Sequence, residues 1–117
     1  MQVLRTHMSA IFNAKRFAGN VIQTVSRTLK EELKFNRSGV TSLDWASYPI
    51  LRFTDAPKIE IDLIDRPTEP PLGAGEAACV PVAAAIANAI YDASGVRMRT
   101  VPFTPERVKA ALGGQSS

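Results

Sequence analysis

Cysteine and histidine are nearly absent from this chain of 117 residues, which holds one of each, Cys79 and His7. A single cysteine excludes an internal disulfide and favours a reducing compartment. A single histidine, with no second ligand nearby in the sequence, argues against a metal site built from side chains. No apolar run approaches the roughly 20 residues of a membrane-spanning helix. We expect no membrane span, no side-chain metal site and a cytoplasmic location, with the periplasm as the open alternative.

Charge is ordinary in amount but uneven along the chain. Charged residues make up 21% of the sequence, and the formal net charge is +3. Residues 1–37 hold seven Lys or Arg against two Glu, whereas the remainder is net negative. A basic segment can attract nucleic acid or anionic lipid, but these basic residues are scattered among apolar ones and match no nucleic-acid motif. We interpret them as a solvated helix face and expect no nucleic-acid partner.

The first third of the chain predicts one helix and a turn. Apolar residues recur at helical spacing across 18–34, where Ile22, Val25, Leu29 and Leu33 share a face. Residues 1–17 have no clear period and are predicted to be irregular, so that 18–117 would form a single domain. Asn36 to Gly39 is predicted to end the helix and reverse the chain. Because Pro49 interrupts residues 40–52, we expect an edge strand or an extended loop there.

The rest of the chain predicts strands and two more helices. Ile59, Ile61 and Leu63 alternate with acidic residues, which predicts a strand over 58–64. A stripe of apolar residues predicts a helix over 80–93, packed against that strand, with Pro81 in its first turn and Gly95 as its C-terminal cap. A short strand is expected over 96–101. Thr104 and Pro105 then start a last helix that the glycines at 113 and 114 end. The fold class is α+β: a small mixed domain with a short sheet packed by two to three helices.

A glycine turn before the second helix is the strongest candidate for a functional site. Gly73, Ala74 and Gly75 would let the backbone approach a ligand closely, and Glu76 follows at the mouth of the helix. A carboxylate at a helix start also complements the helix dipole. From the residues alone, an acid that only complements the helix dipole is the more frequent case. Cys79, three residues further on, is expected to be a small buried side chain.

Several segments in a fixed order carry a family resemblance. They are the glycine turn itself, EIDLIDRP at 60–67, VPVAAAIANAI at 80–90, SGVR at 94–97 and PFTPERV at 102–108. Together they resemble the C-terminal end of the molybdopterin-binding large subunit of the xanthine dehydrogenase and aldehyde oxidase family. Within that family, the sequence pattern is most similar to the isoquinoline 1-oxidoreductase β-subunit branch. The resemblance runs from about residue 18 to residue 112. The stretch TSLDWASY at 41–48 is part of it, and there we expect Trp45 and Tyr48 to pack the domain.

The resemblance implies a role for the candidate site. It makes Glu76 the general base of a hydroxylation reaction, and it places Gly73, Ala74 and Gly75 beside the cofactor. The full enzyme would carry molybdopterin, as a cytosine dinucleotide, whereas the isolated chain would carry no cofactor. Its partners would be the remaining large-subunit domains and an iron–sulfur subunit. Along the first helix the chain departs from the family pattern, with Arg16 in place of a glutamine, Asn20 in place of the second glycine of a pair, and Thr24 in place of a glycine.

Two hypotheses follow for the chain as a whole. The first is a fragment or split subunit of a molybdenum hydroxylase, an oxidoreductase that hydroxylates an N-heteroaromatic ring or an aldehyde, inactive when isolated. The alternative is a non-catalytic, self-associating structural or interaction domain derived from that fold. In both cases an apolar face would be left uncovered. We therefore expect a homo-oligomer of the isolated chain, with Ile22, Val25 and Leu29 as a candidate contact.

Overall fold

Three helices and a small hairpin make up the fold. The computed structural model describes residues 10–62, 68, 70 and 76–114, and their side chains from Ala14 onward. The elements in chain order are α1 (Ala10–Leu29), β1 (Phe35–Asn36), β2 (Gly39–Val40), the 3₁₀ helix η1 (Phe53–Asp55), α2 (Cys79–Ser94) and α3 (Pro105–Gly113). Strands β1 and β2 are antiparallel, with Phe35 opposite Val40 and Asn36 opposite Gly39. The predicted α+β class is confirmed.

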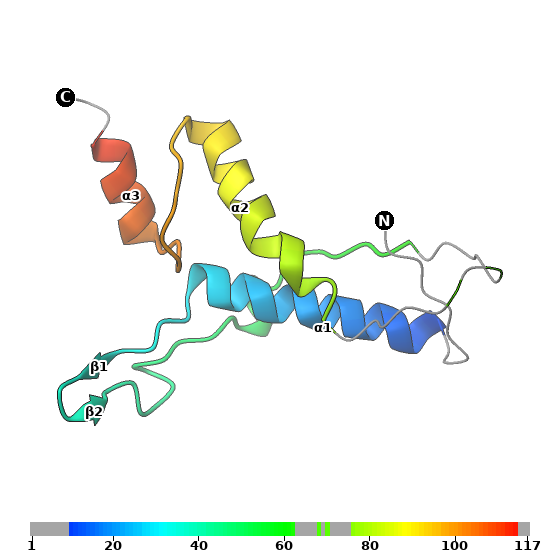
Figure 1. Ribbon diagram of the computed structural model, residues 1–117, viewed down its shortest axis with the longest axis horizontal. Coiled ribbons are helices and arrows are strands. Elements are labelled where there is room, and N and C mark those ends of the chain that lie inside the picture. The colour runs from blue at the N-terminus through cyan, green and yellow to red at the C-terminus, as the bar shows by residue number, and fades with distance from the viewer. Residues whose placement is uncertain (1–9, 63–67, 69, 71–75, 115–117) are drawn as a thin grey trace.

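Helix α1 is the axis of the molecule. Figure 1 shows α2 rising from the middle of α1, while α3 stands beside the far end of α2. The principal helix packing is that of α2 on α1. The β1–β2 hairpin projects away from the helices, beyond the C-terminal end of α1 (Figure 1). No helix in the described part of the chain has both the length and the apolarity that a bilayer crossing demands.

Helix α1 is displaced from its predicted range. It begins at Ala10, so residues 10–17, which we expected to be irregular, are helical, and it ends at Leu29 rather than near residue 34. At this end the Ser26 carbonyl accepts bonds from the N–H groups of both Lys30 (2.9 Å) and Glu31 (3.1 Å). The bond from Glu31 spans five residues, and this wider turn ends the α-helix. Leu33 consequently leaves the helical face and is 56% exposed.

Both predicted later strands are wrong where the structure describes them. Residues 58–62 and 96–101 are assigned to no strand; residues 63–64 lie outside the described part. The alternation itself survives, because Ile59 and Ile61 are half-buried while Glu60 and Asp62 are exposed. Alternation reports one-sided burial of an extended chain, whereas a strand also needs a hydrogen-bonded neighbour. The predicted packing of a strand at 58–64 on α2 gives way to the packing of α1 on α2.

The two later helices are confirmed with their caps. Helix α2 covers Cys79–Ser94 against the predicted 80–93, and Gly95 closes it in the left-handed region with φ of 73°, which glycine adopts without steric cost. Helix α3 begins at Pro105, and the Thr104 hydroxyl accepts a bond from the Arg107 N–H at 3.4 Å. Asn36 to Gly39 does reverse the chain, as the turn of the hairpin.

The apolar core is thin. Within the described ranges, the buried hydrophobic core consists of Val96 and Phe103, at 7% and 6% exposure. Three hydroxyl residues of α1 are equally buried: Thr24, Ser26 and Thr28. The radius of gyration is 17.8 Å, against about 13 Å for a compact domain of this length. The fold therefore depends more than usual on polar contacts between segments.

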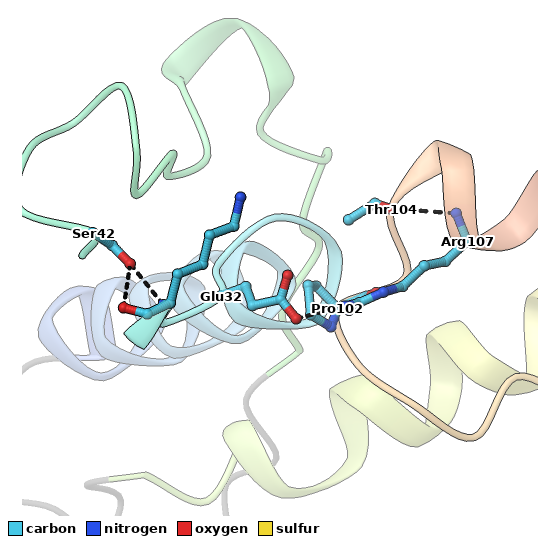
Figure 2. Close-up of polar contacts among 6 residues, drawn as sticks. Glu32, Ser42, Pro102, Thr104 and Arg107 are labelled. Atoms are coloured by element: carbon cyan, nitrogen blue, oxygen red, sulfur yellow. Dashed lines mark hydrogen bonds and ion pairs between the residues drawn. The ribbon is translucent and has the colours of Figure 1, made fainter. Parts of the chain in front are cut away.

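Arg107 makes the longest-range of these polar contacts. Figure 2 shows its side chain reaching from α3 toward Glu32 and the loop before α3. One guanidinium nitrogen pairs with Glu32 Oε1 at 2.5 Å, and the other donates to the Pro102 carbonyl at 3.1 Å. Pro102 is buried. The guanidinium thus ties α3 both to the segment after α1 and to the loop that precedes α3.

Replacing Arg107 with alanine should lower the free energy of unfolding by about 1–2 kcal/mol, because both the ion pair and the bond to a buried carbonyl are lost. Glu32→Ala should cost less than about 1 kcal/mol, since it removes only the half-exposed ion pair. Urea denaturation of the two variants and of the double variant measures the difference. Arg97→Ala is the control, because Arg97 is exposed and, among the described residues, contacts only α2, the helix that directly precedes it. Equal losses for all three single variants would contradict this role.

Candidate functional site

Glu76 lies at the surface directly before α2. Its side chain is exposed, and its carbonyl oxygen accepts a bond from the Cys79 N–H at 3.0 Å. That bond closes the turn that leads into the helix. Gly73, Ala74 and Gly75 fall outside the described residues, so their predicted place beside a ligand stays a prediction.

The start of α2 rests on the middle of α1. The Cys79 thiol donates to the Asn20 carbonyl at 3.7 Å, and Cys79 is half-buried as the only cysteine. Cys79 was expected to be buried, and its side chain is only partly covered. Glu76 is three residues before Cys79 and therefore lies close to the place where the start of α2 meets α1.

The first turn of α2 has no side-chain cap. Ala78 occupies the N-cap position with no capping hydrogen bond, and the first turn contains no acidic residue. Val80, in that turn, is 83% exposed. Uncapped N–H groups at a helix start, with the positive end of the helix dipole, are suited to an anionic group. Among the described residues, no side chain therefore caps the start of α2, where a negatively charged ligand would be favoured.

One face of α1 is polar, basic and exposed. Lys15, Gly19, Gln23 and Arg27 follow one another at intervals of four residues, and all four are exposed. Residues at this spacing share a helix face. A Cβ atom added at Gly19 would have no heavy atom within 4 Å. Nothing in the described part of the chain therefore requires a glycine inside this helix, although glycine lowers helix stability there.

A shallow groove of about 290 Å³ runs along the same helix. It is lined by Gly19, Ile22, Gln23 and Ser26 of α1, and by Ile50 and Leu51 of the loop that follows the hairpin. The Ser26 hydroxyl accepts a bond from the Leu51 N–H at 2.9 Å, which holds this loop on the helix. Sequence reasoning missed the groove. The available signal was Ser26, a small polar residue one position from the apolar face.

Tyr48 and Trp45 have different surroundings. The Tyr48 hydroxyl donates to Glu31 Oε2 at 2.9 Å, and this bond is the main reason why the pKa of Tyr48 lies above its ordinary value. Tyr48 thus packs as expected. For Trp45 the expectation of packing is wrong, because its side chain is 75% exposed.

The described residues offer no group of three or more His, Cys, Asp or Glu that could hold a metal ion. Arg97, which could have contacted a phosphate, instead donates to Asn88 Oδ1 at 2.7 Å and lies over the Tyr91 ring at 3.8 Å. Arg107 is occupied by Glu32 and Pro102. The candidate site is therefore Glu76, the uncapped start of α2 and the exposed face of α1.

Comparison with known proteins identifies the family. No protein-family model matches the chain. The chain is 57% identical over 97 residues to a subunit of nicotinate dehydrogenase from Pseudomonas putida, a match that covers 83% of this chain and 8% of that protein. It is 39% identical over 70 residues to the aldehyde oxidoreductase molybdenum-binding subunit PaoC of Escherichia coli, covering 56% of this chain and 10% of PaoC. The chain belongs to the xanthine dehydrogenase family of molybdenum-binding subunits.

An isoquinoline 1-oxidoreductase, the branch that the sequence resembles, is also among the relatives, at lower identity. The β-subunit of isoquinoline 1-oxidoreductase from Brevundimonas diminuta is 24% identical over 99 residues, covering 85% of this chain. The solved structure of quinoline 2-oxidoreductase from Pseudomonas putida 86 matches 88% of the chain and 14% of its own chain, at 25% identity with a TM-score of 0.74. The chain spans about a tenth of the length of these family members.

Gly19→Ala separates stability from function at this site. The free energy of unfolding of the chain should rise by about 0.5–1 kcal/mol, because alanine favours the helix and its Cβ meets no neighbour. In the molybdenum-loaded enzyme that contains this chain, the same change should lower cofactor content, because the added methyl group takes up the space beside α1. Urea denaturation and metal analysis measure the two effects. Lys109→Ala, at an exposed position of α3 outside the candidate site, is the control. A stabilised variant with full cofactor content would show that Gly19 has no role at the site.

Proposed function

We propose that this chain contributes the general base of a molybdenum hydroxylase that acts on an N-heteroaromatic ring or an aldehyde. The observation that carries the proposal is the exposed Glu76 carboxylate at the uncapped start of α2, where that helix crosses α1. The names of the relatives support the reaction class, since they are a nicotinate dehydrogenase and an aldehyde oxidoreductase. We extend the substrate class and the activity of those proteins to this chain as part of the proposal.

The residues present fit an anionic organic cofactor. The first-turn N–H groups of α2 lack a side-chain acceptor, and the exposed Lys15 and Arg27 give α1 a basic face. Molybdopterin carries phosphate, and its cytosine dinucleotide form carries more of it, so that both features suit it electrostatically. When bound, molybdopterin supplies the two-electron redox chemistry of the hydroxylation.

Glu76 holds and moves a proton. With molybdopterin bound, a carboxylate oxygen of Glu76 would take up the proton of the hydroxyl group that adds to the substrate carbon, and the bond between the Cys79 N–H and the Glu76 carbonyl would hold the backbone of the base in place. Exclusion of water would strengthen this interaction, but the side chain is exposed on this chain. We therefore propose that the remaining domains of the large subunit shield Glu76 from water. An iron–sulfur subunit would accept the electrons. The isolated chain should be inactive.

Location and assembly follow from the same proposal. A free Cys79 suits a reducing compartment, so we propose that the assembled enzyme works in the cytoplasm. The homo-oligomer expected of the isolated chain stays a prediction. Ile22, Val25 and Leu29, its candidate contact, are half-buried.

Glu76→Gln tests the proposed base. The substitution keeps the shape of the side chain but removes its ability to take a proton, so kcat of the molybdenum-loaded enzyme that contains this chain should fall by about 10²–10⁴-fold. Molybdenum content and the urea midpoint of the isolated chain should stay unchanged. Glu60→Gln is the matched control, because Glu60 is another exposed acid of the chain. Full turnover in the Glu76→Gln enzyme would rule out the general base, and loss of folding would assign Glu76 a structural role instead.

A further inference from the structure

Resting on the proposed function, we propose that the segment 33–48, here named the arm, is the surface by which this chain docks onto the rest of the molybdenum-binding large subunit. The arm contains the hairpin and the loop after it, and it projects beyond α1 (Figure 1). Its large apolar side chains face solvent. Their exposed fractions are 56% for Leu33, 75% for Phe35, 45% for Val40, 81% for Leu43 and 75% for Trp45.

Such a surface is unusual for a chain that works alone. Solvent-exposed apolar residues are normally scattered, and a contiguous group of them marks an interaction site. Tryptophan and phenylalanine are also the residues that carry much of the binding energy in interfaces. The exposed apolar side chains of the arm come from both strands of the hairpin and from the loop that follows it. Within the described residues, by contrast, the buried hydrophobic core consists only of Val96 and Phe103.

Polar contacts hold the arm in shape without using these apolar side chains. The Ser42 hydroxyl accepts a bond from the Lys34 N–H at 2.6 Å and donates to the Lys34 carbonyl at 3.3 Å, as Figure 2 shows. The Thr41 N–H donates to the same carbonyl at 2.8 Å. Asp44 closes the next turn by accepting bonds from Ser47, and these bonds keep the pKa of Asp44 below its ordinary value.

The arm is therefore ordered before it binds. A surface whose backbone is already fixed loses less conformational entropy on association, so more of the apolar burial appears as affinity. Tyr48 anchors the base of the arm to Glu31, just past the end of α1. The geometry is that of a rigid projection tipped with apolar side chains, which suits insertion into a groove of a larger body.

The length of the relatives identifies the occupant. The segment matched by this chain is 8% of the nicotinate dehydrogenase polypeptide and 14% of the quinoline 2-oxidoreductase chain. In both, the matched segment belongs to a polypeptide many times longer. We therefore assign the arm to the remaining part of the large subunit rather than to a second copy.

Co-expression of two pieces tests this assignment. The chain is produced together with the matching nicotinate dehydrogenase polypeptide of Pseudomonas putida, from which the matched segment is deleted and to which an affinity tag is added. The amount of chain recovered per tagged partner is measured. Trp45→Ala should lower this recovery at least tenfold, because the loss of a central tryptophan typically weakens an interface by that much or more. Leu112→Ala, at an exposed leucine of α3, is the matched control and should leave recovery within about threefold.

The remaining readouts keep the test decisive. Trp45 is the only tryptophan of the chain, so incorporation of 5-fluorotryptophan into the chain gives one fluorine resonance, which should shift on assembly as the indole leaves water. Glu76→Gln should dock normally, so that failure of the proposed base and failure of docking are distinguished. An unshifted resonance in the complex, or equal recovery of the Trp45→Ala variant, would overturn the proposal. A dimer of the chain alone that Trp45→Ala dissociates would overturn it in favour of a second copy.

Discussion

Everything in this fold depends on the polar attachment of later segments to α1. The buried Thr28 carbonyl accepts the Phe103 N–H at 2.7 Å, and the buried Ser26 hydroxyl accepts the Leu51 N–H. Asn20 receives the Cys79 thiol. Three segments distant in the sequence are thus tied to the C-terminal half of one helix. A hydrogen bond to a buried group costs the full desolvation penalty when it is broken, so α1 can specify the positions of α2, the hairpin loop and the loop before α3 despite a thin apolar core.

This arrangement has a functional consequence. Because Cys79 at the start of α2 is held on the middle of α1, Glu76, three residues earlier, is presented at the surface near this contact. The basic face of α1 is exposed, and the start of α2 has no side-chain cap. What the chain does not supply is cover for the carboxylate. The large exposed side chains of the arm and the exposed Glu76 therefore point to the same conclusion, a segment shaped to work inside a larger subunit.

The sequence predicted the helices and caps better than the extended segments. Gly95, Thr104 and Pro105 act through local chemistry, so their roles could be deduced from neighbouring residues alone. The strand predicted at 58–64 failed in its described part because pairing depends on a neighbour that alternation cannot reveal. The premature end of α1 is set by the Ser26 carbonyl, which accepts the N–H groups of Lys30 and Glu31. The surroundings of Trp45 depend on the turn that Asp44 and Ser47 close. No periodicity encodes either contact. The glycine turn at 73–75 falls outside the described residues and stays a prediction.

The central claim is that this chain places Glu76 at the cofactor of a molybdenum-binding large subunit. The most direct test is a crystal structure of the Pseudomonas putida nicotinate dehydrogenase in which the segment matched by this chain is replaced by the chain itself. We measure the distance between the Glu76 carboxylate and the molybdenum ligands. The account predicts that a carboxylate oxygen lies within hydrogen-bond distance of one of these ligands. A folded, molybdenum-loaded chimera in which Glu76 faces away from the cofactor would contradict it.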